Sequence, residues 1–236
     1  MRTLIVTGAS SGIGLETTKK LLDRGYRVIG IARDPTRAMI DASNFIPIEL
    51  DLANLSILPQ AFSKLNRDYP DISGLIACAG RGRFGAIEEF SYEQIKALFD
   101  LNFMSACFLV KALMPSLKKF ERSDIIFIGS EAALAGGKQG AIYCATKFAL
   151  RGLAQSLRKE CAKSAVRVTL INPGMVKTSF FDSLSFEPGA ADDNYIEADN
   201  VAETIFVALE MRPATVIDEI NLSPLKKVIV HKPKRD

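Results

Sequence analysis

Cysteine and histidine are both scarce in this 236-residue chain, and their scarcity excludes several kinds of site. The four cysteines, at positions 78, 107, 144 and 161, form no CxxC pair, and His231 is the single histidine. A zinc site made of Cys and His needs more ligands than this, so we predict no metal site. Cysteines without paired spacing indicate free thiols in a reducing compartment.

Long apolar runs and a large excess of one charge are also missing. No uninterrupted apolar run approaches the roughly 20 residues that span a bilayer. Met1 leads directly into a strand-like segment, residues 2–7, so we expect no secretory leader. Thirty Lys and Arg against 27 Asp and Glu leave a net charge of +3, too little to indicate nucleic acid as a partner. We therefore expect a cytoplasmic protein that binds neither nucleic acid nor a membrane.

Short β-branched runs alternate with segments of helical period along the whole chain. Strands are expected at 3–7, 27–32, 45–50, 74–77, 124–129, 167–171 and 216–222. Most of these runs are almost continuously apolar, which is typical of strands buried on both faces of a sheet. The alternation predicts an α/β fold, a Rossmann-type doubly wound, mostly parallel seven-stranded sheet with helices on both faces. No repeat or linker interrupts it, so we expect a single domain over 1–236.

Helix signals lie between the expected strands. A helical pattern over 13–24 is followed by Gly25, and glycine is typical just after a helix C-terminus. Ser91 opens an S-x-x-Q pattern, which predicts a capping box. Asn200, with a glutamate three residues on, predicts the start of another helix.

A glycine-rich segment at residues 7–14, TGASSGIG, follows the first expected strand and opens the first helix. Glycines allow the tight turn and let a pyrophosphate approach the backbone, and free N–H groups at the helix start bind the anion. The alternative is a strand–helix turn without a ligand. The expected cofactor-binding residues here are Gly8, Ser10, Ser11, Gly12, Ile13 and Gly14.

The second expected strand ends in Ala32-Arg33-Asp34. In a dinucleotide-binding fold this strand end meets the adenosine ribose, where an acid favours a 2′-hydroxyl and an arginine favours a 2′-phosphate. Ala32 stands where the acid is expected, and Arg33 follows it. We therefore predict NADP(H), with NAD(H) as the alternative if Asp34 reaches the ribose.

Tyr143 and Lys147 lie four residues apart and so share one face of an expected helix. A nearby ammonium lowers the pKa of a phenol from its value near 10, which makes tyrosine a usable general acid or base. Tyr92 and Lys96 have the same spacing, but they lie in an ordinary amphipathic segment. Tyr143 lies on an apolar helix after the fifth strand, and Ser130 ends that strand, at the sheet edge where α/β ligand sites lie.

Taken together, these motifs resemble the classical short-chain dehydrogenases/reductases from Met1 to about Leu222. The segment at 7–14 matches the family's TGxxxGIG, and Tyr143 with Lys147 matches its YxxxK. Ser130 matches the catalytic serine. The remaining matches are Asp51-Leu52 for the adenine contact, Asn102 for the helix asparagine, and NPGMVKT at 172–178 for the segment beside the nicotinamide.

The resemblance implies a role for each matched residue. Tyr143 would donate a proton to a ketone or aldehyde oxygen, and Ser130 would hydrogen-bond the developing alkoxide. Lys147 would bind the nicotinamide ribose and lower the pKa of Tyr143. Asn102, the fourth catalytic residue, would hold a water that relays protons. The cofactor-binding residues implied beyond the glycine segment and Arg33 are Asp51, Leu52, Ala79, Tyr143, Lys147, Pro173, Gly174, Val176 and Thr178.

One departure is the family's NNAG, which appears here as Ala77-Cys78-Ala79-Gly80. Alanine and cysteine cannot replace the asparagine amides, so local rigidity and cofactor affinity are expected to change more than the chemistry. Cys78 is expected to be a small buried apolar side chain, the alternative being a redox-sensitive thiol.

The resemblance also places a substrate loop at 175–198, whose three phenylalanines suggest an apolar lid. The alternative is plain packing of this segment on the core. A homodimer or homotetramer is implied, paired through helices near 102–119 and 141–163, although a core face would have the same apolar content. The basic end, 226–236, is expected to be a solvated tail.

The sequence therefore predicts an NADP(H)-dependent oxidoreductase that transfers hydride between the nicotinamide and a small-molecule ketone, aldehyde or secondary alcohol. One alternative is a non-catalytic dinucleotide-sensing regulator, which needs no Ser-Tyr-Lys set. Another is a sugar-nucleotide epimerase or dehydratase of the extended branch, which usually adds a C-terminal substrate domain. Only about 60 residues follow the sixth expected strand here.

Overall fold

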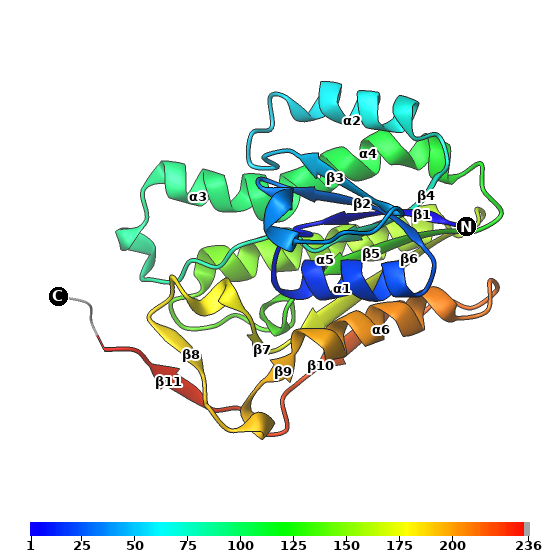
Figure 1. Cartoon of the computed structure of the whole chain (residues 1–236). Coiled ribbons are helices and arrows are strands. Elements are labelled where there is room, and N and C mark those ends of the chain that lie inside the picture. The colour runs from blue at the N-terminus through cyan, green and yellow to red at the C-terminus, as the bar shows by residue number, and fades with distance from the viewer. Residues whose placement is uncertain (234–236) are drawn as a thin grey trace.

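The computed structural model describes residues 1–233, and within them the central sheet has seven strands. The strand order is β10-β6-β5-β4-β1-β2-β3, and every neighbouring pair is parallel. Figure 1 shows the sheet between two layers of helices. The strands are β1 (Thr3–Thr7), β2 (Arg27–Ala32), β3 (Phe45–Glu49), β4 (Ile72–Ala77), β5 (Ser123–Ile128), β6 (Val166–Pro173) and β10 (Glu219–Leu222).

The predicted fold class is confirmed, and the bounds of β1 and β2 agree with the prediction to the residue. The other five strands differ from it by one to three residues at one or both ends, as β4 and β10 illustrate. β4 begins two residues early, at Ile72, because a register shift next to Thr3 of β1 allows one more pairing. β10 begins at Glu219, three residues later than expected. The parallel pairing brings the carboxyl ends of all seven strands to one edge of the sheet.

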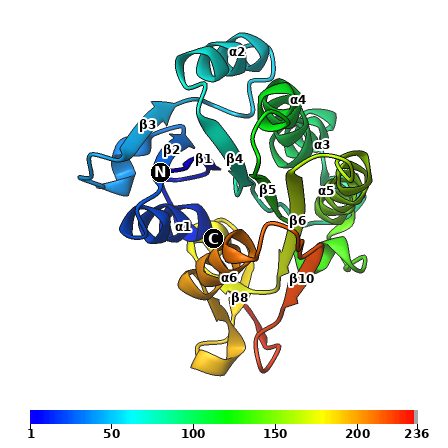
Figure 2. The same cartoon turned by 90° about the vertical axis from the view of Figure 1, so that its right-hand side faces the viewer.

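Helices cover both faces of this sheet. They are α1 (Gly12–Asp23), α2 (Leu58–Asp68), α3 (Tyr92–Phe99), α4 (Ser105–Leu117), α5 (Ala141–Glu160) and α6 (Ala198–Glu210). Figure 2 shows α1 and α6 on one face and α2, α4 and α5 on the other. Each layer buries its own apolar cluster against the sheet, for example Phe62, Leu113 and Leu150 on one face and Leu21, Val201 and Ile205 on the other.

Two of the three predicted helix signals are confirmed. Gly25, just beyond α1, has a φ of 79°, which glycine adopts without strain. Ser91 accepts a hydrogen bond from the Gln94 backbone and Gln94 returns one to the Ser91 backbone, which is a complete capping box. The start predicted at Asn200 is wrong. α6 begins two residues earlier, because the short strand β9 (Ile196–Glu197) leads directly into it.

One helical segment does meet the length and hydropathy of a membrane-spanning helix, contrary to expectation. It runs over Tyr92–Leu117, with a mean hydropathy of 1.5, and combines α3, a π-helical turn (Asp100–Met104) and α4. Leu109, Leu113 and Leu117 of α4 are buried in the core cluster, so its apolar side packs inside the protein. The segment is therefore weak evidence for a membrane span.

The basic end of the chain is more ordered than a solvated tail. β11 (Ile229–His231) pairs antiparallel with β8 (Phe186–Pro188), as Figure 1 shows below the main sheet. Lys232 donates to the backbone carbonyl of Phe181 at 2.6 Å, and Lys227 forms an ion pair with Glu131 at 2.8 Å. The described residues of this segment are nearly all exposed, as expected of a solvated segment, but they do not form a free tail, because Lys227 and Lys232 find partners next to Ser130 and in the segment at 175–198. Residues 234–236 lie outside the described residues.

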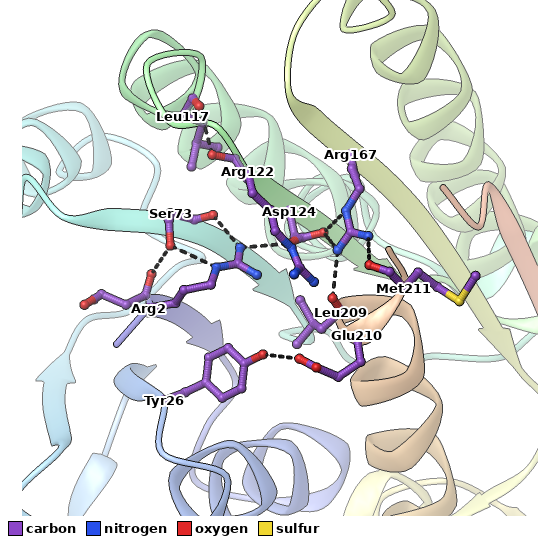
Figure 3. A network of polar contacts seen from close by, with 12 residues as sticks. Arg2, Tyr26, Ser73, Leu117, Arg122, Asp124, Arg167, Leu209, Glu210 and Met211 are labelled. Atoms are coloured by element: carbon purple, nitrogen blue, oxygen red, sulfur yellow. Dashed lines mark hydrogen bonds and ion pairs between the residues drawn. The ribbon is translucent and has the colours of Figure 1, made fainter. Parts of the chain in front are cut away.

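The amino ends of the strands are joined by a buried ion network (Figure 3). Asp124 of β5 accepts hydrogen bonds from Arg2 and from Arg167 of β6, at 2.7 Å each. Arg167 also donates to the carbonyls of Leu209 and Met211, both at 2.9 Å, at the end of α6. The side chains of Asp124 and Arg167 are each only 5% exposed. This network connects three strands to α6 at the edge opposite Ser130.

Candidate active site

The glycine segment forms a close turn between β1 and α1. Gly8 and Gly12 have positive φ angles of 70° and 52°, which favour glycine. A Cβ on Gly14 would lie 2.3 Å from the Gly8 carbonyl oxygen, so only glycine fits there. Ser11 is the N-cap of α1 and forms no side-chain cap hydrogen bond within the described residues. The first N–H groups of α1 are thus directed to the sheet edge, as anion binding requires.

Further predicted cofactor residues come to the same edge from other strands. Thr178 lies on the glycine segment, because a Cβ on Gly12 would be 3.2 Å from the Thr178 methyl group. The Ala79 N–H donates to the Thr7 hydroxyl at 3.0 Å. The other residues at this edge are Asp51 and buried Leu52 beyond β3, Pro173 and Gly174 at the end of β6, and Val176 in the short strand β7 (Val176–Lys177).

Arg33 and Asp34 are both exposed beyond the end of β2, at the place predicted for the ribose. The Asp34 carboxylate accepts from the Thr36 N–H at 3.1 Å and from the Thr36 hydroxyl at 2.5 Å. These bonds lower the pKa of Asp34 and orient its carboxylate toward its own turn. Arg33 has no ion-pair partner among residues 1–233.

Ser130 lies two residues beyond the end of β5, after Gly129, at the carboxyl edge of the sheet. Its backbone N–H donates to the Asn172 side-chain oxygen at 3.3 Å, and its hydroxyl accepts from the Ala132 N–H at 3.2 Å. A Cβ on Gly129 would lie 2.1 Å from the same Asn172 oxygen, so glycine is needed for this approach. Asn172 in turn donates to Glu219 at 2.9 Å. The backbone of Ser130 is therefore held in place by Asn172 of β6, which is itself bonded to Glu219 of β10.

Tyr143 and Lys147 lie one turn apart on α5, and both are 6% exposed. The Lys147 ammonium donates to the Ile128 carbonyl at 3.0 Å and lies 5.8 Å from the centre of the Tyr143 ring. Tyr92, by contrast, is 88% exposed, and Lys96 pairs with Asp100. The structure thus groups Ser130, Tyr143 and Lys147 and separates the Tyr92 pair, as the sequence context predicted.

The expected lowering of the Tyr143 pKa is wrong for this structure. Burial raises the pKa of Tyr143 to about 12, and side-chain hydrogen bonding with Ser130 opposes only part of the rise. Burial also lowers the pKa of Lys147 to about 8. The physical reason is that both groups are removed from water, while the ammonium is directed to the Ile128 carbonyl rather than to the phenol oxygen.

Asn102 lies in the π-helical turn between α3 and α4, and it is buried. Its side-chain oxygen accepts from the Arg81 N–H at 2.9 Å, and its NH₂ group donates to the Arg81 carbonyl at 3.0 Å and to the Thr146 hydroxyl at 3.2 Å. The side-chain amide therefore connects the loop after β4 to α5. The predicted water relay remains a prediction.

Cys78 lies in the segment that replaces the family's asparagine pair. Burial raises the pKa of its thiol to about 12, and the nearby Lys147 ammonium opposes this only in part. A thiol with this pKa is protonated at neutral pH and is a poor nucleophile, which agrees with a small apolar role. Alanine and cysteine cannot make the hydrogen bonds of the asparagine side chains, but Thr7 and Asn102 accept hydrogen bonds from the backbone N–H groups of Ala79 and Arg81, which follow Cys78.

Sequence reasoning missed two kinds of site residue. Asn172 positions the Ser130 backbone. Asn172 is the first residue of the NPG motif, but the family resemblance connects that motif only with cofactor binding. Phe84 packs against the Tyr143 ring at 5.0 Å between centroids. It lies in a loop of weak pattern, so the sequence held no signal for its place in the site.

A strand–glycine turn–helix unit, with Ser130, Tyr143 and Lys147 at the carboxyl edge of a parallel sheet, defines a nucleotide-binding α/β enzyme. The sequence matches the family described as short chain dehydrogenase over residues 2–188. The protein therefore belongs to the short-chain dehydrogenase family and is an oxidoreductase.

A relative agrees with this assignment, and solved structures have a similar fold. The sequence is 31% identical to a protein of Helicobacter pylori named "probable short-chain type dehydrogenase/reductase VdlC", covering 86% of this chain and 75% of that one. The fold is similar to that of an alcohol dehydrogenase from Thermococcus sibiricus complexed with 5-hydroxy-NADP, with a TM-score of 0.84 and 24% identity over 97% and 99% of the two chains. It is also similar to a 4-hydroxyisoleucine dehydrogenase complexed with NADH, with a TM-score of 0.83 and 20% identity over 95% and 97%.

Proposed function

We propose that the protein is an NADP(H)-dependent oxidoreductase that interconverts a ketone or aldehyde and the corresponding alcohol, with Tyr143 as general acid and base. The observation that carries this proposal is the grouping of Ser130, Tyr143 and Lys147 at the sheet edge that also holds the glycine segment. A dinucleotide-sensing regulator would not need this set of side chains. The proposed enzyme is a single cytoplasmic domain.

The residues present fit a nicotinamide dinucleotide. A Cβ at position 14 would clash with the Gly8 carbonyl and fill the space of the glycine turn. The first turn of α1 also carries no acidic residue within the described chain. An anionic pyrophosphate is favoured at such a helix start by the N–H groups and the helix dipole. Of the two structural neighbours above, one is complexed with an NADP derivative and one with NADH. When bound, the nicotinamide supplies or accepts the hydride.

The chain's own residues would hold the carbonyl and move the proton. A phenol with a pKa near 12 is protonated at neutral pH, so Tyr143 starts as a proton donor, as reduction of a carbonyl requires. Ser130, whose backbone is held by Asn172, would hydrogen-bond the oxygen as negative charge grows on it. Lys147 would bind the cofactor's ribose and stabilise the phenolate after transfer.

Replacement of Tyr143 tests the enzyme proposal. Tyr143→Phe removes the proton donor but keeps the ring, so the melting temperature and cofactor affinity should change little while kcat falls by about 10²–10⁴-fold. The matched control is Tyr92→Phe, which removes a hydroxyl with the same spacing to a lysine and should be silent. Substantial turnover in Tyr143→Phe would contradict the assigned role.

Arg33 carries the proposed choice of NADP(H) over NAD(H). An exposed guanidinium at the end of β2 is suited to bind a 2′-phosphate. The Asp34 carboxylate already accepts hydrogen bonds from Thr36 in its own turn. Arg33→Ala should weaken NADPH binding by about 10- to 100-fold and leave NADH binding unchanged, because a charged hydrogen bond is lost. Arg67→Ala on α2 is the control. Unchanged NADPH affinity in a fluorescence titration would reject the preference.

The segment at 175–198 is proposed to be the substrate loop. Met175, Phe181 and Leu184 are buried in a small apolar cluster of their own. This cluster lies beside Tyr143, because Phe180 of the same segment packs against the Tyr143 ring at 6.0 Å between centroids. An apolar segment at this position would exclude water from the proton transfer.

A further inference from the structure

Five aromatic rings contact one another in a closed circuit around the proposed proton donor. Tyr143 contacts Phe84 at 5.0 Å between ring centroids, and Phe84 contacts Phe186, also at 5.0 Å. Phe186 contacts Phe181 at 5.9 Å, and Phe181 contacts Phe180 at 5.2 Å. Phe180 returns to Tyr143 at 6.0 Å. We name this set of five residues the aromatic circuit.

The circuit is assembled from three separate parts of the chain. Phe84 comes from the loop after β4, Tyr143 comes from α5, and the other three come from the segment at 175–198. Gly82 allows the loop to approach, because a Cβ there would lie 2.5 Å from the Phe180 ring and 3.0 Å from the Phe84 ring. The two rings that touch Tyr143 therefore converge on one backbone position.

Two lysine–glutamate pairs border the circuit. Glu131, next to Ser130, is paired with Lys227 at 2.8 Å. Lys232 is bonded to the Phe181 carbonyl and lies 3.4 Å from Glu187. The Arg83 guanidinium lies over the Phe90 ring, 5.6 Å from its centre. A charged substrate group packed against the rings themselves would have to break one of the two lysine–glutamate pairs or lose its hydration without a partner.

We propose that the substrate carries an uncharged apolar group next to its carbonyl, aromatic or of similar bulk, which packs against Phe84 and Phe180. The inference rests on the proposed function. A carbonyl that accepts a proton from Tyr143 brings its substituents to the rings that flank Tyr143. Apolar area removed from water there is favourable at about 25 cal/mol per Å², and a favourable ring pair adds about 0.5–1.5 kcal/mol.

Two compounds with the same phenyl ring test the charge preference. Acetophenone has a methyl group on its carbonyl carbon, and phenylglyoxylate has a carboxylate. We expect kcat/KM for acetophenone to exceed that for phenylglyoxylate by at least about 100-fold, because the carboxylate would be buried unpaired. Equal or reversed kcat/KM values would overturn the inference.

Phe84→Leu tests the role of the ring itself. It should raise the KM for acetophenone about tenfold, with a smaller change in kcat and no change in NADPH affinity, because a flanking aromatic contact is lost. The matched control is Phe206→Leu, a half-buried ring at the opposite sheet edge, in contact with Arg24. Unchanged acetophenone kinetics in Phe84→Leu would reject the specificity role.

A binding measurement separates failure of this inference from failure of the proposed function. Calorimetric titration compares 1-phenylethanol with mandelate, the alcohols of the two probes, on wild type and Phe84→Leu. Turnover with a preference for the charged probe would reject the inference alone. No turnover of any aldehyde or ketone would reject the enzyme proposal. If there is no turnover, the binding data decide the apolar preference. It is supported if 1-phenylethanol binds more tightly than mandelate and loses affinity in Phe84→Leu, and it is rejected by any other result.

Discussion

At the scale of single residues, burial has more influence on the site than the charges do. Tyr143 and Lys147 have the spacing that predicts a lowered phenol pKa, yet burial raises the pKa of Tyr143 and lowers that of Lys147. A sequence shows which groups are near one another along a helix but not how much water each one loses. The spacing therefore identified the pair correctly and predicted the wrong direction for the tyrosine.

The lowered pKa of Lys147 has a consequence for stability. Between about pH 8 and 10.5 the unfolded chain holds this proton and the folded chain does not, so this group makes the protein more stable as pH rises through that window. The raised pKa of Tyr143 acts in the opposite sense above pH 10, where the unfolded chain loses its proton first.

Lys147→Met should remove the lysine contribution. Relative to this variant, wild type should gain about 1–3 kcal/mol of unfolding free energy between about pH 7 and pH 10. Denaturant unfolding at both pH values measures it. Lys96→Met, at an exposed lysine with the same spacing from a tyrosine, should show no such change. A constant difference between wild type and Lys147→Met at both pH values would contradict the low pKa.

At the scale of elements, β5 and β6 support the candidate site at their carboxyl ends and a buried ion pair at their amino ends. Their carboxyl ends position Ser130 through Asn172, and their amino ends hold the buried pair of Asp124 and Arg167. Removing one partner of such a pair leaves a charge buried without compensation, which costs more than the loss of an exposed ion pair. The amino edge is therefore where the sheet is most sensitive to a change of charge.

Asp124→Asn should destabilise the protein by about 3–5 kcal/mol, because Arg167 and Arg2 lose their shared carboxylate. Asp218→Asn is the control. It removes one charge from an ion pair with Arg158 in which the Asp218 side chain is 68% exposed, and it should cost less than about 1 kcal/mol. Guanidinium unfolding of both variants gives the comparison. Equal losses would show that the network does not stabilise the sheet.

At the scale of the whole molecule, the structure separates core positions from candidates for self-association. The helices near 102–119 and 141–163 were expected to pair subunits through their apolar side chains. Four of these side chains, Leu109, Leu113, Leu150 and Leu157, are buried in the core of this chain, whereas Phe103, Phe108 and Leu153 are only partly buried. Phe148 on α5 is 43% exposed instead. We propose that the protein forms a homodimer or homotetramer through the face of α5 that carries Phe148.

Light scattering tests this proposal. Wild type should have the mass of two or four chains, and Phe148→Asp should shift toward one chain because a charge would be buried in an apolar contact. Val207→Asp, at a residue of α6 that is 47% exposed, is the control and should leave the mass unchanged. A monomeric wild type would reject the proposal.

The sequence by itself determined the sheet and the set of candidate site residues, because both rest on local patterns. Apolar β-branched runs predicted β1 and β2 to the residue, and the glycine turn needed conformations that its own glycines allow. Only the tertiary structure decided the surroundings of Tyr143, the positioning of Ser130 by Asn172, the pairing of β11 with β8, and the packing of Phe84. These depend on contacts between segments far apart in the chain, for which no single segment carries a periodic signal.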